Sequence, residues 1–405
     1  MQYQKIILSG QKEILETKII KRNIEIFYDD LLKLQKILVL VWPRRAWKTF
    51  FMYQIAQELI NSWKMKKEQI VYINFANLLF FDFSVEKLLE QYFELFPELK
   101  PVFFLDEIQE LENFDKNLLY LKSKWFQIFT TWSNSKLLSS EISTNLRWKY
   151  LEKFIFPLDF KEFLKFKNIE LKNFILEEEI WKIKKLFLEF LKWGAFPEVV
   201  LAENKTTKRD LLNSYFNSMI FIDIIERYNI ENEKLLKELI NKVFKNIWKE
   251  ISVHKIFNDF KSRGFKVSKN TIYNYLWYLE DIFLISELKN FYKQNNRKIY
   301  LYDTWFLLLL SEEENFWQKF ENFVFLELKR KYDEFYYKKN WSEIDFFISN
   351  KDINIQVCFE LNDENVSRET EWLLKQDWSK ELIYFDNSLK NTIDKEINLI
   401  NFLTI

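Results

Sequence analysis

The chain has 405 residues, with 60 lysines and arginines against 60 aspartates and glutamates, so its formal net charge is zero. This length predicts about two to four domains, and the charge balance excludes a global basic field for nucleic acid or membranes. The single cysteine, Cys358, excludes an intramolecular disulfide and fits a reducing cytoplasm. Because the start lacks the apolar core of a signal peptide and no apolar run approaches ~20 residues, we expect a cytoplasmic protein without a membrane span.

The N-terminal part leads into a candidate phosphate-binding loop. Residues 1–36 have the spacing of amphipathic helices, and the apolar run Ile37–Val41 predicts a buried parallel strand. Residues 42–49 then match the pattern G-x-x-x-x-G-K-[ST], except that Trp42 and Trp47 stand at the two glycine positions. Apolar residues at helical spacing follow directly, so the order of strand, loop and helix is the one that this pattern requires.

A loop of this kind would bind ATP with Mg²⁺. Lys48 would reach the β- and γ-phosphates, and the Thr49 hydroxyl would hold Mg²⁺. The backbone N–H groups of the loop would contact the phosphates at backbone angles that glycine tolerates and tryptophan does not. The candidate nucleotide-binding residues are Trp42, Pro43, Arg44, Arg45, Ala46, Trp47, Lys48, Thr49 and Phe50.

Glycine is scarce throughout the chain. At the usual frequency of about 7%, roughly 28 glycines are expected, but the sequence has 3 glycines and 15 tryptophans. Trp63 follows an expected helix and Trp341 stands in an expected turn between two strands, and both places favour glycine. One hypothesis is that UGA means glycine in the code of this gene, so that many of these tryptophans are glycines in the native protein. The alternative is a decayed ATPase fold with real tryptophans, and Trp181 and Trp193 are candidates for genuine ones.

Strands and helices alternate after the loop, which is typical of a parallel, doubly wound sheet. Further strands are expected at residues 69–75, 102–106 and 126–131, and Ser84 is the expected N-cap of the helix after the first of them. The strand at 102–106 ends in Asp106, which would hold the Mg²⁺ that bridges the phosphates. Glu107 follows it and would polarise a water for attack on the γ-phosphate.

Residues 130–135, at the end of the last strand, are a third candidate feature. Asn134 would contact the γ-phosphate or the attacking water there, which makes it a candidate catalytic residue beside Glu107. An equally open interpretation is a turn whose residues cap the next helix. Arg147 and Lys149, just beyond, would offer positive charge to a phosphate at a subunit boundary, although single basic residues are more often solvated surface.

The middle of the chain is helical in pattern. Residues 151–235, rich in Phe, Leu and Lys, predict a helical lid, and residues 236–290 predict a winged helix with Ser268 as an N-cap. His254, the single histidine, is expected on the surface, and no zinc site is expected. Such modules bind DNA or dock a protein client, and both stay open. The basic patch that would contact DNA phosphates comprises Lys255, Lys261, Arg263, Lys266 and Lys269.

Residues 291–405 resemble a restriction-endonuclease-like α/β domain. In that fold a helix Glu, a strand Asp and a Glu-x-Lys strand bind a metal and activate water. Glu327, on the same predicted helix as Glu321, and Asp345 match the first two positions. The two positions that need Glu and Lys hold Gln356 and Cys358. The absence of both predicts a degenerate nuclease fold that is used for recognition.

These motifs resemble the prokaryotic AAA+ family of ATP-binding proteins with a C-terminal domain of unknown function. The resemblance covers nearly the whole chain, through residues 42–49, 104–109, 131–135, 156–163, 194–198, 223–227, 303–305, 316–329, 342–346 and 355–358. The family has glycine where this chain has Trp42, Trp47, Trp132, Trp148, Trp305, Trp317 and Trp341. The family commonly has Gly-Arg where this chain has Trp148-Lys149. An arginine finger is therefore not expected at this position.

The resemblance implies an α/β fold with a P-loop, AAA+-like parallel sheet in residues 1–150 and a helical lid in 151–235. A winged helix in 236–290 and a small, degenerate nuclease-like domain in 291–405 would follow. It implies a Mg²⁺-dependent ATPase whose turnover drives a conformational switch. One alternative is a nucleic-acid-binding or protein-interaction scaffold on a non-hydrolysing ATPase fold. Another is an active nuclease, which the residues at 356 and 358 argue against. The client and the oligomeric state are not defined by the sequence.

Overall fold

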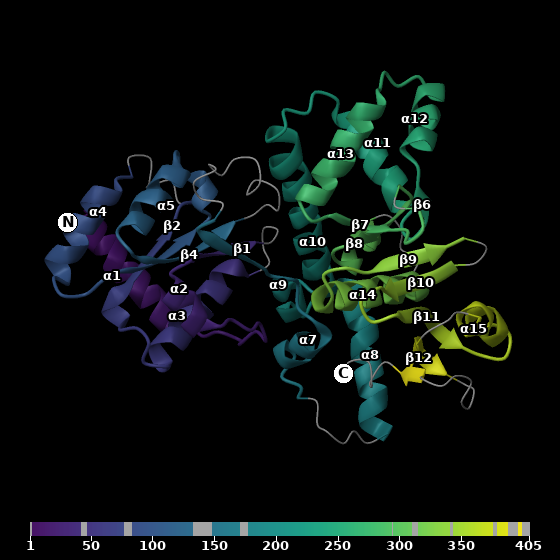
Figure 1. Cartoon of the computed structure of the whole chain (residues 1–405), viewed down its shortest axis with the longest axis horizontal. Coiled ribbons are helices and arrows are strands. Elements are labelled where there is room, and N and C mark those ends of the chain that lie inside the picture. Colours follow the sequence, from purple (N-terminus) through teal and green to yellow (C-terminus); the bar gives the residue numbers. More distant parts are fainter. Residues whose placement is uncertain are drawn as a thin grey trace. The chain divides into compact units, whose positions relative to one another are not determined.

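The computed structural model describes residues 2–41, 47–76, 83–132, 148–170, 177–293, 295–309, 315–340, 343–375, 379–387 and 396–398. The chain forms two compact units, Met1–Phe156 and Pro157–Ile405, whose elements are labelled in Figure 1. The first unit ends at Phe156, past the expected boundary at residue 150, because residues 150–154 form a strand of its sheet.

The first unit is built on a five-stranded parallel sheet of order β2-β3-β4-β1-β5 (Figure 1). Its strands are β1 (Ile37–Val41), β2 (Ile70–Asn74), β3 (Val102–Asp106), β4 (Gln127–Trp132) and β5 (Tyr150–Phe154). All of β1 is buried, as its apolar run predicts. The predicted α/β fold with a P-loop-type parallel sheet is confirmed. The edge strand β5 is not predicted, because its residues are only partly buried and carry no apolar run.

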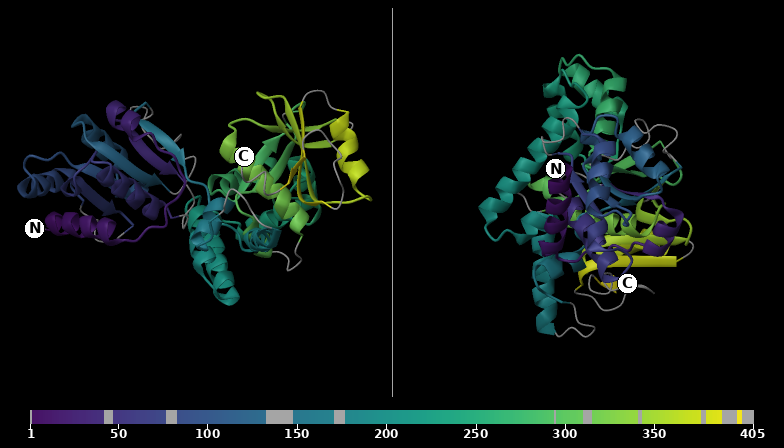
Figure 2. Two further views of the ribbon diagram at one scale, coloured as in Figure 1. Left: turned by 90° about the horizontal axis from the view of Figure 1, so that it is seen from below. Right: turned by 90° about the vertical axis from the view of Figure 1, so that its left-hand side faces the viewer.

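Helices precede the first of these strands and connect the later ones (Figures 1 and 2). They are α1 (Gln2–Glu16), α2 (Tyr28–Leu34), α3 (Lys48–Asn61), α4 (Val85–Leu95) and α5 (Phe114–Ser123), with 3₁₀ turns at Lys67–Gln69 and Ile108–Glu110. Ser84 caps α4 as predicted, since its hydroxyl oxygen accepts a hydrogen bond from the Lys87 N–H. A Cβ at Gly10 of α1 would lie 2.8 Å from the Tyr72 carbonyl oxygen, so glycine allows this helix to approach β2 closely.

The second unit begins with helices. They are α7 (Phe160–Phe166), α8 (Glu177–Trp193), α9 (Pro197–Leu201), α10 (Lys205–Ile220), a π-helical turn at Phe221–Glu226, α11 (Glu233–Phe244), α12 (Val253–Ser262) and α13 (Lys269–Asp281). A small antiparallel sheet of order β6-β8-β7 accompanies the last three helices. Its strands are β6 (Glu250–Ile251), β7 (Ile285–Lys289) and β8 (Arg297–Leu301). Ser268 caps α13 as predicted, through the Thr271 N–H.

A second five-stranded sheet, of order β13-β12-β11-β10-β9, completes this unit. After a 3₁₀ turn at Thr304–Leu309, its elements are α14 (Phe316–Lys331), β9 (Tyr336–Lys339), β10 (Glu343–Ile348), β11 (Ile353–Leu361), α15 (Val366–Leu374), β12 (Ser379–Asn387) and β13 (Glu396–Asn398). Successive residues of a strand face opposite sides of a sheet. Phe359 of β11 meets Phe320 of α14, whereas Cys358 packs with Leu373 of α15, so the two helices cover opposite faces.

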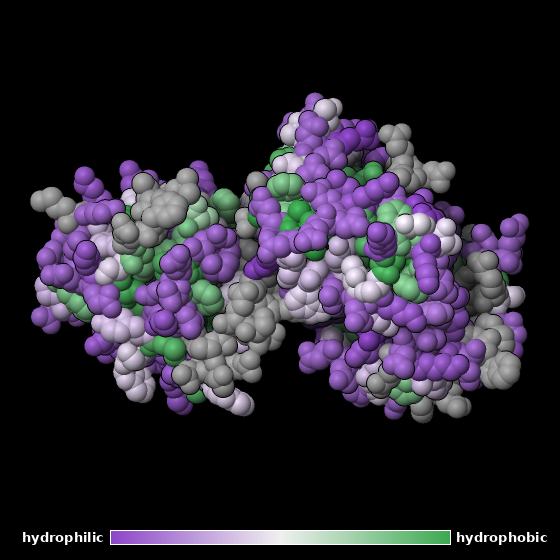
Figure 3. Space-filling view, turned by 90° about the horizontal axis from the view of Figure 1, so that it is seen from above, coloured by the Kyte–Doolittle hydropathy of each residue, from purple (hydrophilic) through white to green (hydrophobic). Residues whose placement is uncertain are grey.

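Figure 3 shows a face of the molecule on which hydrophilic residues predominate and hydrophobic residues form small, separate patches. Tryptophans are prominent among the exposed large side chains, with Trp63 at 95%, Trp148 at 83% and Trp125 at 68% exposure. Such exposure of the largest side chain is unusual and bears on the glycine hypothesis. Within the described ranges, no helix combines the length and the apolar character needed to cross a membrane.

Candidate nucleotide-binding site

The candidate phosphate loop ends where α3 begins. Trp42, Pro43, Arg44, Arg45 and Ala46 lie outside the described residues, and Trp47 is the N-cap residue of α3 with φ 60° and ψ 33°. That is the left-handed backbone region, which glycine enters freely and a bulky side chain enters at a cost of about 1–2 kcal/mol. The Trp47 ring also packs against Phe50, with ring centroids 4.4 Å apart.

Lys48 and Thr49, the first two residues of α3, meet the end of β3. The Lys48 side chain is buried, and its Nζ lies 3.2 Å from Oε1 of Glu107. The Thr49 hydroxyl donates a hydrogen bond of 2.6 Å to Oδ2 of Asp106. Four residues that two separate sequence patterns single out therefore come together at one place. They lie at the carboxyl ends of β1 and β3, two parallel strands of the same sheet that β4 separates.

Asp106 is fully buried and is surrounded by hydroxyl groups. Besides Thr49, the Thr131 hydroxyl donates to Oδ1, and the Tyr72 hydroxyl lies 3.4 Å from Oδ2. Burial and the neighbouring Glu107 carboxylate raise the pKa of Asp106, although the two threonine hydroxyls and the charge of Lys48 act in the opposite direction. Within the described part of the chain, the negative charge of this buried carboxylate is not balanced by a cation of its own, and a second acid lies beside it. Binding of a divalent cation would therefore be electrostatically favourable.

The donor set fits Mg²⁺ chemically. In the part of the chain that the structure describes, no three acidic, histidine or cysteine side chains gather into a metal site. Mg²⁺ usually takes one or two carboxylates and completes its shell with water and substrate phosphates. Asp106 and the Thr49 hydroxyl would supply the protein oxygens, and a Mg²⁺ ion bound there would neutralise charge on the phosphates.

Glu107 has a constrained backbone and an engaged side chain. Its φ of 50° and ψ of 50° are left-handed, and its N–H donates to the Thr131 hydroxyl oxygen at 2.8 Å. Gln109 Nε2 donates to Glu107 Oε2 at 2.6 Å, while Lys48 lies at Oε1. Non-glycine residues in this region of backbone space concentrate at functional sites.

Thr131 and Gln109 are two residues of the site to which the sequence pattern assigned no role. Thr131 is at the end of β4, beside β3, because Leu105 pairs with Thr130 in register. The strand order was the information needed to place it, and the sequence does not provide that order. Asn134 lies outside the described residues, as does Arg147, so their roles stay predictions. Lys149 is exposed and directly precedes β5.

The predicted basic patch on α12 and α13 is exposed, and part of it converges. Lys261 and Lys269 both lie over the ring of Phe257, at 5.8 and 5.7 Å from its centroid. Arg263 is neutralised by an ion pair with Glu238 at 2.6 Å. The positive charge of the patch therefore centres on the lysines. His254 is exposed, as expected, beside Asn258.

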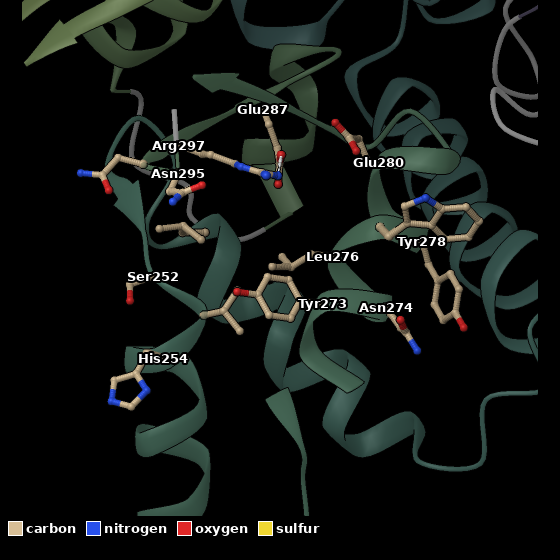
Figure 4. Close-up of a pocket in the computed structure, with 14 residues that line it drawn as sticks. Ser252, His254, Tyr273, Asn274, Leu276, Tyr278, Glu280, Glu287, Asn295 and Arg297 are labelled. Carbon is tan, nitrogen blue, oxygen red and sulfur yellow. Dashed lines mark hydrogen bonds and ion pairs between the residues drawn. The ribbon is translucent and has the colours of Figure 1, made fainter. Parts of the chain in front are cut away.

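A cavity of about 920 Å³ lies beside this patch (Figure 4). Its lining joins the start of α12 at Ser252 and His254 with the α13 residues Tyr273 and Asn274, and with Arg297 of β8. Figure 4 shows the Arg297 side chain reaching Glu287, with which it forms an ion pair. Because its arginine is already paired and Glu280 also lines it, the cavity has no excess positive charge for a phosphate.

The acidic cluster of the C-terminal sheet corrects one prediction. Glu327 does not join Asp345; its carboxylate pairs with Arg330 one turn along α14, although burial raises its pKa. The helix acid beside Asp345 is Glu321, which accepts a hydrogen bond of 2.7 Å from Tyr300 and lies 3.8 Å from the Nζ of Lys298. The two acids of α14 are six residues apart and point to different surroundings, which residue type alone does not distinguish.

Gln356 and Cys358, at the positions where a nuclease has Glu and Lys, lie in different surroundings as well. The Cys358 thiol is buried in the core against α15 and donates to the Glu360 carbonyl oxygen at 3.1 Å. Gln356 is only partly buried. Asp345 is buried and accepts a hydrogen bond from the Val357 N–H at 2.9 Å. This geometry gives no support to nuclease chemistry.

Fold and site together define an ATPase-like protein of the P-loop class. A family described as an AAA domain (AAA_14) matches residues 34–164, and a domain of unknown function (DUF8612) matches residues 184–314. The uncharacterized protein MJ1544 of Methanocaldococcus jannaschii is 38% identical over 380 residues, which cover 91% of this chain and 83% of that protein. An uncharacterized protein of Haemophilus influenzae is 30% identical over 365 residues, covering 86% and 88%. The chain belongs to the family of AAA-domain proteins that includes these relatives.

Solved AAA+ structures were also matched. The Saccharomyces cerevisiae Hsp104–ADP complex matches 69% of this chain and 39% of its own, at 13% identity and a TM-score of 0.29. PCH-2 of Caenorhabditis elegans matches 69% of this chain and 66% of its own, at 14% identity and a TM-score of 0.26. At these TM-scores the likeness carries no argument about this chain.

Proposed function

We propose that the protein binds ATP with Mg²⁺ and hydrolyses it, and that turnover drives a conformational switch. The observation that carries this proposal is the hydrogen bond of 2.6 Å between Thr49 and Asp106, with Lys48 and Glu107 directly beside it. In the proposed site Lys48 and the loop N–H groups hold the phosphates, and Thr49 and Asp106 hold the metal. Glu107 orients the attacking water.

The rest of the proposed cycle concerns the γ-phosphate and the remaining domains. Asn134 would sense the γ-phosphate from the end of β4. Turnover would then drive the helical lid at 151–235 and the C-terminal segments between two states. These roles are proposed from the family resemblance and the order of the segments in the chain.

The proposal includes glycine at Trp42 and Trp47, through the use of UGA as a glycine codon. Backbone geometry supports this. Of the eleven described non-glycine residues with positive φ, four are tryptophans: Trp47, Trp63, Trp125 and Trp248, with φ from 59° to 68°. Bulky side chains are genuine outliers there. Tryptophan is therefore found repeatedly where the backbone has the conformation of a glycine.

The ends of helices give a direct comparison. After α12, Gly264 has a φ of 80°. Its N–H donates to the Lys261 carbonyl oxygen, and the N–H of the next residue, Phe265, donates to the Phe260 carbonyl oxygen. After α3 and α5, Trp63 and Trp125 occupy the same place in the same pair of hydrogen bonds. One real glycine and two tryptophans thus close three helices in the same way, at the position where helices favour glycine.

Buried indole nitrogens support the hypothesis independently. The Nε1 atoms of Trp132, Trp248 and Trp305 are buried, and each is without a hydrogen-bond partner. A buried donor left unpaired costs about 1–3 kcal/mol, and native tryptophans usually find a partner for this group. Glycine at these three positions would remove the unpaired donors.

Mass spectrometry of the native protein over residues 37–50 tests the recoding. Glycine at 42 and 47 is the expected result. Tryptophan at both positions would contradict the recoding and would mean a blocked phosphate loop. ATP hydrolysis would then give way to a scaffold function on a decayed ATPase fold.

Nucleotide binding is tested on the protein with Trp42→Gly and Trp47→Gly, here called the glycine form. It should bind ATP in a Mg²⁺-dependent way, as measured by titration calorimetry. Lys48→Ala in the glycine form should lower the affinity roughly 100-fold or more, because the variant lacks a charge-assisted hydrogen bond to the phosphates. Lys67→Ala, on an exposed turn of the same unit, is the control. Equal affinity in the Lys48→Ala variant and its parent would contradict the assignment.

A second candidate function is DNA or protein binding by the segment from α11 to β8. Its order of helix, strand, helix, helix, strand, strand and its sheet order β6-β8-β7 support a winged helix. The observation in favour of DNA is the convergence of Lys261 and Lys269 over Phe257.

Charge reversal tests DNA binding by this segment. Changing Lys266 and Lys269 to Glu should abolish DNA retention and lower the salt dependence by about 0.9 for each phosphate that the protein no longer neutralises. Arg263→Gln is the matched control, because Glu238 already neutralises that arginine. Retention unaffected by the reversal would leave protein docking as the function of the segment.

A further inference from the structure

Gln109 lies next to the proposed general base on a fixed turn. It belongs to the 3₁₀ turn Ile108–Glu110 that follows β3 and Glu107. The Glu110 N–H donates to the Glu107 carbonyl oxygen and the Leu111 N–H to that of Ile108, both at 3.0 Å. Gln109 therefore starts from a defined backbone position, and its Nε2 reaches Glu107 Oε2 at 2.6 Å.

Both carboxylate oxygens of Glu107 are occupied in this structure. Lys48 Nζ lies 3.2 Å from Oε1, and Gln109 Nε2 donates to Oε2. A general base needs one oxygen free to accept the proton of a water. The two partners differ in this respect, because Lys48 is also the residue proposed to hold the phosphates, whereas Gln109 is an uncharged amide with no such second task.

The amide of Gln109 is oriented by Glu107. Its Oε1 atom is buried and has no hydrogen-bond partner, so the amide has no polar anchor at its other end. Exchange of the two amide ends would place an oxygen against a carboxylate oxygen, where two acceptors repel. The pair is thus a donor and a charged acceptor in a fixed relation, which is the stronger class of hydrogen bond.

We propose that Gln109 is a positioning residue for ATP hydrolysis, which keeps Glu107 oriented once bound phosphates draw Lys48 away. Gln109 then retains Oε2, and Oε1 faces the attacking water as the free base. The proposal rests on the proposed ATPase function and adds a residue with a defined role to it. In the absence of nucleotide, the same two partners hold Glu107 in a resting arrangement with neither oxygen free.

Steady-state kinetics of Gln109→Leu in the glycine form test this role. The leucine keeps the side-chain volume and removes the donor. The kcat should fall roughly 10- to 100-fold, because misorientation of the base has an effect of that size, while KM for ATP stays within about twofold. The acid limb of the pH–rate profile should move to higher pH, since removal of a donor to a carboxylate favours its protonated form.

The Gln109→Glu variant gives a second, opposite dependence on pH. At neutral pH two carboxylates would repel and the variant should be slow. At lower pH the protonated side chain of the variant can donate to Glu107 again, so its activity relative to the parent should rise as pH falls. A purely structural role would not produce this reversal. Glu110→Gln, an exposed change on the same turn, is the control and should leave kcat unchanged.

The outcomes separate the two proposals. Unchanged kcat and pH profile in Gln109→Leu would overturn the role of Gln109 and leave the ATPase proposal standing. A parallel fall in ATP affinity and kcat would also overturn it, because that is the signature of local unfolding. A glycine form that does not bind ATP at all would instead overturn the proposed function itself.

Discussion

Two buried acidic clusters, one in each unit of the protein, differ in how their negative charge is balanced. In the first unit, Asp106 receives hydrogen bonds from the uncharged hydroxyls of Thr49 and Thr131. The lysine of that site, Lys48, pairs with Glu107 rather than with Asp106. Asp106 is therefore solvated by neutral donors, and its charge has no ion-pair partner of its own among the described residues.

In the second unit, the cluster contains its own cation. The buried Lys298 Nζ lies 2.5 Å from Glu343 and 3.8 Å from Glu321. Burial lowers the pKa of Lys298, but Glu321, Asp345 and Glu343 outweigh this and raise it, so the lysine stays charged. Burial and Glu321 raise the pKa of Asp345 well above its ordinary value, which favours its neutral form.

The difference separates a site that can take a ligand from one that is already complete. Around Asp106, a dication would supply the missing positive charge, and its binding would be favoured by the burial of the carboxylate. Around Asp345, the charge of Lys298 already compensates the acids. A cluster closed in this way stabilises a fold, and a cluster left open can bind a ligand.

Lys298→Met should break the closed cluster and have the largest effect on stability. Removing one partner of a buried charge network costs about 3–5 kcal/mol, because the acids are left without compensation. Hydrogen–deuterium exchange of the β8 and β10 peptides in the full chain measures this destabilisation. Lys339→Met is the matched control: it contacts the same Glu343 at 2.8 Å but is 44% exposed, so its effect should be below about 1 kcal/mol. Similar destabilisation in the two variants would contradict a closed cluster.

Asp106→Asn should have a smaller effect with the opposite sign. Because the folded pKa of Asp106 is raised, its contribution to stability is full below the ordinary Asp range and is lost as pH rises through the folded pKa. The variant avoids this destabilisation, so without nucleotide it should gain about 1–2 kcal/mol at neutral pH. The gain should shrink toward about pH 4.

Thermal unfolding of parent and variant across pH measures this difference. In the glycine form with Mg²⁺ and ATP, the parent should be the more stable of the two. Only the parent has the carboxylate that binds Mg²⁺ together with ATP, and bound ligand stabilises the folded state. A variant less stable than its parent at neutral pH without nucleotide would mean that Asp106 is not an open site.

Much of the first unit was predictable because its signals are local. The apolar run of β1, the lysine and threonine at the start of α3 and the acids after β3 each lie in a short stretch of sequence. Parallel strands bring their carboxyl ends to one edge, which is why Lys48, Thr49, Asp106 and Glu107 meet. The sequence also indicated the caps at Ser84 and Ser268, since capping depends on residues three apart.

The features that the sequence analysis missed or assigned wrongly depend on contacts between segments that are distant in the sequence. Thr131 reaches Asp106 only because β4 lies next to β3, and Lys298 of β8 reaches Glu321 of the helix α14. The assignment of Glu327 as the partner of Asp345 was wrong because it relied on residue type along one helix, while Arg330 lies within reach of Glu327. Strand order and helix rotation decide such contacts, and neither is written in a local pattern.

The smallest expected effects distinguish tryptophans that replace glycine from genuine ones. Trp63→Gly should stabilise the protein by about 0.5–1 kcal/mol, because relief of left-handed strain, about 1–2 kcal/mol, exceeds the backbone entropy that glycine costs. Trp181→Gly should destabilise it by about 1 kcal/mol, because Trp181 lies within α8. Both side chains are exposed, at 95% and 69%, so packing contributes little at either position.

Urea unfolding of the parent and the two variants gives the differences in free energy of unfolding, provided that the slope of this free energy against urea concentration is unchanged. Opposite signs at two exposed tryptophans would mean that backbone conformation, and not the side chain, decides the outcome. The same reasoning then extends to Trp47, whose φ of 60° places it in the same class as Trp63 at the start of the helix that carries Lys48. Destabilisation of equal size at both positions would remove the conformational argument for glycine, and the open site around Asp106 would have to work beside a tryptophan.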